Sequence, residues 1–75
     1  MSNISQETVE RLKKEYPKGT KVELVYMNDP YVHIEKGTHG TVMTVDDIGT
    51  IHVRWDNGSQ LGVAYGEDII KKVEV

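Results

Sequence analysis

Apolar and polar residues alternate along the chain with two different periods. In the first stretch, Val9, Leu12 and Tyr16 recur at spacings of 3 and 4, which is typical of one face of an amphipathic helix. Ser5 is suited to cap this helix, because its hydroxyl can accept a hydrogen bond from a backbone amide of the first turn. The pattern predicts a helix over residues 5–16. Its apolar stripe is narrow, so we expect it to cover an open end or edge of another element.

The second period is two residues long, which indicates β-strands. In the first strand it predicts that Val22, Leu24 and Tyr26 point inward. The segments that carry the alternation are residues 20–27, 41–45, 50–55, 60–63 and 69–73. Short strands separated by turn residues are typical of small barrels. The sequence therefore predicts a mainly β fold in a single domain, residues 1–75: a five-stranded SH3-like small barrel (about 20–75) after one N-terminal α-helix (about 5–16).

Glycines mark the predicted turns. A three-residue loop, Asp56, Asn57 and Gly58, places Val53 opposite Leu61 on the apolar face, whereas a two-residue loop would place a charge there. We therefore expect a left-handed conformation at Gly58.

Two more glycines belong to predicted turns. Gly49 closes a four-residue turn over 46–49 and should also have a positive φ. Gly40 is expected in a sharp turn into the second strand. In the hairpin that follows, His52 is expected opposite Met43.

Composition limits the classes of function. The chain has 75 residues, no cysteine and a formal net charge of -3. So short a chain has no room for a second lobe or an enclosed active-site cavity, and we expect no enzyme. The absence of cysteine fits a reducing, cytoplasmic location. No apolar run is long enough for a signal peptide or a membrane span.

The polar residues do not form a recognisable catalytic or metal-binding pattern. His33, His39 and His52 have spacings that match no compact ligand set, so we expect neither a metal site nor a cofactor. Ser59 has no histidine placed to activate it. Adjacent carboxylates such as Glu67 and Asp68 point apart in an extended chain and do not converge on one substrate.

Aromatic residues are the strongest candidates for binding. Tyr31, Trp55 and Tyr65 fall in regions that lie close together in SH3-like barrels, where aromatic strips hold extended or proline-rich peptides. The alternative for Trp55 is a place in the core, because Trp55 alternates in step with the inward residues of its strand. The same alternation places Tyr26 in the core. The acidic residues expected to flank this groove, and to favour a basic protein partner, are Asp29, Glu35, Asp46 and Asp47.

Lysines suggest an alternative partner, nucleic acid. The basic residues in question are Lys13, Lys14, Lys18, Lys71 and Lys72. Glutamates are interspersed among them, which is more typical of a solvated mixed-charge face than of a phosphate-binding surface.

Two long strings carry a resemblance to a known family: YPKGTKVELVYMNDPY, and KGTHGTVMTVDDIGTIHVRWDNGSQLGVAYGED. They resemble a small uncharacterised SH3-like family, a domain of unknown function found in Firmicutes, their phages and conjugative elements. Its hallmark is G-T-x-G-T-V followed by V-D-D-I-G-x-I-H-V-x-W-D-N-G-S. The resemblance implies an SH3-like barrel in a bacterial or mobile-element accessory protein, and it carries over no substrate or catalytic residue. We therefore expect a non-enzymatic binding module for a protein partner.

Overall fold

The computed structural model describes residues 4–28 and 34–73. Its elements are α1 (Gln6–Glu15), β1 (Lys21–Tyr26), β2 (His39–Val45), β3 (Thr50–Trp55), β4 (Gln60–Ala64) and β5 (Ile69–Lys72). The predicted helix is confirmed. The Ser5 hydroxyl accepts a hydrogen bond from the Thr8 amide at 3.1 Å, and the helix ends at Tyr16, whose amide donates to the Leu12 carbonyl.

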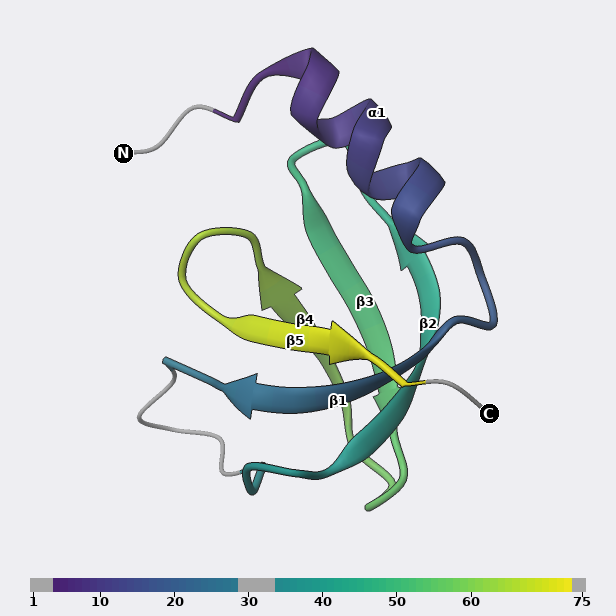
Figure 1. The fold of residues 1–75 in the computed structure, drawn as a ribbon, viewed down its shortest axis with the longest axis vertical. Coiled ribbons are helices and arrows are strands. Elements are labelled where there is room, and N and C mark those ends of the chain that lie inside the picture. Colours follow the sequence, from purple (N-terminus) through teal and green to yellow (C-terminus); the bar gives the residue numbers. More distant parts are fainter. Residues whose placement is uncertain (1–3, 29–33, 74–75) are drawn as a thin grey trace.

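The five strands form one antiparallel sheet in the order β4-β3-β2-β1-β5. The prediction of a mainly β fold with an N-terminal helix is confirmed, but the sheet is not closed into a barrel. In the described residues, β4 and β5 are the two edges, and only an isolated bridge between Tyr65 and Asp68 lies between them. The sheet bends so that β1 and β5 cross β3 and β4, while α1 lies over the end where β2 passes into β3 (Figure 1).

Side chains from four strands and the helix meet inside this bend. Trp55, Leu24 and Val63 are each about 1% exposed, and Leu12 of α1 packs into the same cluster. The indole N–H of Trp55 donates to the Leu61 carbonyl at 3.3 Å, so its polar atom has a partner inside the fold. The core therefore uses the chain's one tryptophan as its largest fully buried side chain.

The register of β3 and β4 agrees with the sequence prediction. Val53 lies opposite Leu61 and Ile51 opposite Val63. The loop between the strands is the three-residue one, because the Trp55 amide donates to the Ser59 carbonyl at 2.8 Å.

Two β-bulges break the simple alternation elsewhere. Met43 is the extra residue in β2, so His52 lies opposite Thr44, and its predicted pairing with Met43 is wrong. Val25 is the extra residue in β1, and beyond it the alternation is reversed. Tyr26 is consequently 52% exposed, and the prediction that it points into the core is wrong.

The turn glycines are partly as predicted. Gly49 and Gly58 have φ values of 81° and 93°, which confirms the left-handed conformation expected for both. The Asn57 side chain accepts from the Ser59 amide at 2.9 Å, and the Asp56 amide donates to the His39 carbonyl at 2.9 Å. Gly40 does not form a turn. It lies inside β2 opposite Trp55, where the close approach of the neighbouring strand requires a residue without a Cβ.

Candidate functional site: a groove between the helix and the sheet edges

An open groove of about 550 Å³ separates α1 from the ends of β4 and β5. Most of its lining surface is apolar, and its charged members are Arg11, Glu15 and Asp68. The residues that line it are Arg11, Leu12, Glu15, Tyr16, Ile51, Val63, Tyr65, Gly66, Asp68, Ile69 and Ile70. From the sequence we excluded only an enclosed cavity, and the volume of this open groove lies within the range of ligand sites.

A second hollow of about 420 Å³ lies on the other side of Tyr65 and includes Ile48 and Glu67. Within the described residues, four large apolar side chains are exposed, and three of them border these two hollows: Ile48, Tyr65 and Ile69. Monomeric proteins seldom expose such clusters without a use for them. The groove is therefore the part of the described surface best suited to bind another molecule.

Asp68 fixes the turn that presents Tyr65. One of its carboxylate oxygens accepts from the Ala64 amide at 2.9 Å, and the other accepts from the Asn28 amide at 2.7 Å. The Ala64 carbonyl in turn accepts from the amides of Glu67 and Asp68. With the backbone held in this way, Tyr65 stays 48% exposed.

The helix supplies the opposite wall and contacts Tyr65 directly. The Arg11 guanidinium donates to the Tyr65 hydroxyl at 3.2 Å, so this cation is turned toward the ring that divides the two hollows. Farther along the helix, burial, and then the carboxylate of Glu15, raise the pKa of Tyr16 above its usual value. The Tyr16 hydroxyl therefore stays protonated, and the Lys72 ammonium lies 5.3 Å from the centre of its ring.

Carboxylates outnumber cations in the two hollows. The acidic residues that line them are Glu15, Glu67 and Asp68, against Arg11 among the described residues of their lining. Lys72 adds a cation beside the Tyr16 end of the groove. The two hollows taken together are therefore more acidic than basic, and Glu67 of the second hollow adds to this excess.

Of the two predicted aromatic residues that the structure describes, Tyr65 lines the groove and Trp55 does not. Trp55 is 1% exposed and packs in the core, so its ring is not available to a partner. Asp29 and Tyr31 lie outside the described residues. Tyr65 is thus the member of the predicted set on which a binding site can be built.

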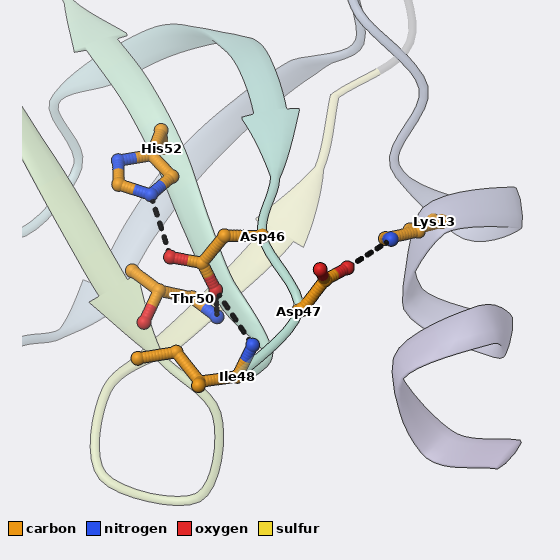
Figure 2. A network of polar contacts seen from close by, with 6 residues as sticks. All are labelled: Lys13, Asp46, Asp47, Ile48, Thr50 and His52. Atoms are coloured by element: carbon orange, nitrogen blue, oxygen red, sulfur yellow. Dashed lines mark hydrogen bonds and ion pairs between the residues drawn. The ribbon is translucent and has the colours of Figure 1, made fainter. Parts of the chain in front are cut away.

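Asp46 and Asp47 do not flank this groove, and they hold the β2–β3 turn and the helix instead (Figure 2). The Asp46 carboxylate accepts from the Ile48 and Thr50 amides at 3.1 and 2.9 Å and pairs with His52 at 2.9 Å. Burial alone would raise its pKa, but the hydrogen bond from His52 and those from the two amides outweigh it and hold the pKa below its usual value. Asp47 forms an ion pair with Lys13 of α1 at 2.7 Å.

Several of the predicted basic residues are already engaged within the fold. Besides Lys13, Lys71 pairs with Glu23 at 3.4 Å, and Lys72 lies over the Tyr16 ring. Lys14 and Lys18 form no ion pair with the described residues. The lysines therefore do not act as one continuous patch of unpaired charge.

Each of the two histidines that the structure describes pairs with one carboxylate, and His33 lies outside the described residues. His39 contacts Glu23 at 3.0 Å, and this hydrogen bond, with the charge of Lys71, lowers the Glu23 pKa despite some desolvation. In residues 4–28 and 34–73, no group of three or more His, Cys, Asp or Glu side chains is arranged to hold a metal ion. The single helix in this part of the chain is too short and too polar to cross a membrane.

Comparison with known families supplies a classification. The family model for the domain of unknown function DUF4314 matches residues 5–73. The chain belongs to this family. The match covers all six elements and both walls of the groove. No curated protein and no solved structure gives a significant match to the chain.

Sequence reasoning missed the helical wall of the groove. Arg11 and Glu15 were not candidates, because nothing in the local pattern shows which part of the sheet the helix faces. The narrow stripe of Val9, Leu12 and Tyr16 was the available signal, since it predicted a helix that covers only an edge or an end of another element.

Proposed function

We propose that this member of the DUF4314 family is a non-enzymatic module that binds an extended, basic segment of a partner protein in the groove between α1 and β5. The observation that carries the proposal is the clustering of exposed apolar side chains around Tyr65, within a hollow whose walls carry more carboxylates than cations. Apolar contact supplies affinity in such a site, and complementary charge selects the partner.

The polar groups of the groove support a binding role over catalysis. Both carboxylate oxygens of Asp68 accept backbone amides, and Arg11 is directed to the Tyr65 hydroxyl. An acid–base mechanism needs groups that converge on a substrate atom, and these groups are directed to each other and to the backbone instead.

The fold supports a more specific assignment. We propose that the sheet is an open variant of the SH3-like arrangement, because β1 to β4 follow one another as a meander and β5 returns to pair with β1. The family resemblance and the lack of cysteine favour an accessory protein of bacteria or their mobile elements that acts in the cytoplasm.

A peptide selection tests the proposed function. Immobilised protein is used to select binders from a random-peptide display library, and a selected peptide is titrated into ¹⁵N-labelled protein. We expect lysine- or arginine-containing peptides that shift the amides of Tyr65, Gly66 and Ile69. Failure to select any peptide, or shifts confined to the far end of the sheet near Asn57, would overturn the proposal.

A matched pair of variants makes this test specific. Tyr65→Ser and Tyr26→Ser remove tyrosines of similar exposure, 48% and 52%, of which only Tyr65 lines the groove. Burial of an aromatic side chain in an interface contributes about 1–3 kcal/mol, so Tyr65→Ser should weaken peptide binding about 5- to 150-fold. Tyr26→Ser should leave the affinity unchanged, and equal losses in both variants would count against this groove.

A further inference from the structure

No strand of the described residues pairs with the outer edge of β5, and the hydrogen-bond pattern identifies which backbone groups face this edge. The Leu24 amide donates to Thr38 and its carbonyl accepts from Gly37, so the backbone of Leu24 is directed away from β5. Ile70 lies opposite Leu24. In an antiparallel pair, residues opposite each other either exchange both hydrogen bonds or none. The N–H and C=O of Ile70 are therefore directed to the open edge.

The same reasoning applies at the end of the strand. The Val73 amide donates to the Lys21 carbonyl at 2.9 Å, which makes this a hydrogen-bonded position. Lys72 lies opposite Val22, one residue along, and so belongs to a pair without hydrogen bonds. Lys72 thus presents its N–H and C=O outward beside those of Ile70.

This open edge adjoins the groove. Ile69 and Ile70 line the groove from β5, while Leu12 and Tyr16 line it from the helix. A chain laid along β5 would place alternate side chains on the groove side, over these apolar residues. Backbone pairing and side-chain burial are thus available to one extended segment at one place.

We propose that the partner segment binds as a sixth strand, antiparallel or parallel to β5, with its backbone paired to Ile70 and Lys72 and an apolar side chain between α1 and β5. This inference rests on the proposed function and specifies how the groove would be used. A basic side chain of the segment is directed to Glu15, which lines the same wall.

The charge of the edge favours a different chain over a second copy of this one. Pairing two copies of β5 would bring their lysines, Lys71 and Lys72, close together across the new interface. Lysines on an edge strand are a common protection against such self-association. A partner segment avoids the same repulsion when its basic side chains face the carboxylates of the two hollows and an uncharged residue lies beside Lys72.

A proline substitution tests the pairing on the protein side. Lys72→Pro removes an outward N–H, and proline is tolerated in edge strands when its nitrogen faces away from the sheet. Lys72→Ala is the control, because it removes the same side chain and keeps the N–H. We expect Lys72→Pro to bind a groove-selected peptide about 3- to 10-fold more weakly than Lys72→Ala, the effect of one lost hydrogen bond.

N-methylation of the peptide tests the same pairing without changing the protein, so it decides the question even if Lys72→Pro fails to fold. Methyl groups placed on successive backbone nitrogens should weaken binding at every second residue only, since alternate amides of an added strand face β5. Binding that tolerates every methyl group, or selected peptides rich in proline, would overturn strand addition. If such peptides still shift the Tyr65 amide, the proposed function stands without it.

Sedimentation of the free protein tests whether a second copy of this chain occupies the β5 edge. We expect a monomer for the wild type and for both Lys72 variants. A wild-type dimer that Lys72→Pro dissociates, and that competes with the peptide, would assign the β5 edge to a second copy and overturn the proposal.

Discussion

Gly40 and Gly58 are both required by the fold, and for different physical reasons. A Cβ at Gly40 would lie 2.5 Å from Val53 Cγ1 and 2.8 Å from Trp55 Cε3, which are both core atoms. A Cβ at Gly58 meets nothing within 4 Å, but its φ of 93° is one that residues with a Cβ rarely adopt. Substitution at Gly40 is therefore opposed by packing, and substitution at Gly58 by backbone strain.

The magnitude for Gly40→Ala follows from these distances. Carbon atoms pack at about 3.5–4.0 Å, so Val53 and Trp55 must move by about 1 Å. Overpacking of this kind costs about 1–3 kcal/mol, and the lower entropy of the unfolded alanine chain offsets about 0.4–1 kcal/mol of it. The central values leave a net loss of about 1.3 kcal/mol, which for a chain of 75 residues lowers the Tm by about 5–10 °C.

The measurement is urea unfolding followed by the fluorescence of Trp55, which is the single tryptophan and is buried. Gly58→Ala should cost a similar amount, about 1–2 kcal/mol. Asparagine separates the two causes, because it tolerates the left-handed conformation but is larger than alanine. We expect Gly58→Asn to be more stable than Gly58→Ala, and Gly40→Asn to be less stable than Gly40→Ala.

The comparison has a clear refuting result. If Gly40→Ala is as stable as the wild type, the close approach of β2 and β3 at this position is wrong. If Asn is better than Ala at both glycines, the two positions do not differ in the way described.

We make three more predictions for side chains away from the groove. Ser5→Ala removes the acceptor of the Thr8 amide and should lower the free energy of unfolding by about 1 kcal/mol. Ser5→Gly removes the same acceptor but should cost only a few tenths of a kcal/mol, because glycine is itself tolerated at N-caps; urea titration checks both. The folded-state pKa of Asp46 lies below its ordinary value of 3.8. The ionised Asp46 carboxylate therefore stabilises the fold fully above pH 3.8, and this stabilisation is lost as the pH falls through the folded-state pKa. The stability difference between wild type and Asp46→Asn should therefore shrink on acidification, and a difference independent of pH would contradict this. With Lys13 paired to Asp47, we expect no gel shift of duplex DNA between about 50 and 200 mM salt; a steeply salt-dependent shift would favour the nucleic-acid alternative.

Local sequence patterns were sufficient to predict the elements and one strand register. The helix cap at Ser5, the five strands and the Gly58 loop each depend on neighbours in the sequence, and each was predicted. The pairing of Val53 with Leu61 was predictable because a shift of one residue would have put Arg54 on the apolar face.

The groove was less predictable, because it depends on where distant segments meet. Tyr65 was a candidate from the sequence, but the contact of its hydroxyl with Arg11 joins residues 54 positions apart. Trp55 shows the opposite error, since the sequence made it a binding candidate although it is buried. Its phase favoured the core while its place in the predicted aromatic strip favoured a partner, and its 1% exposure assigns it to the core.

The two β-bulges, which interrupt the period-two alternation, also affect the shape of the sheet beside the groove. Extra residues at Val25 and Met43 break the period-two alternation, and bulges also bend and twist a sheet more strongly. The sheet bends over its core without closing, so β4 and β5 end as separate edges beside the helix. A regular alternation would have been easier to interpret, but a flatter or fully closed sheet would offer no such groove. The same irregularities that misplaced Tyr26 and His52 in the prediction thus contribute to the bend of the sheet around its core.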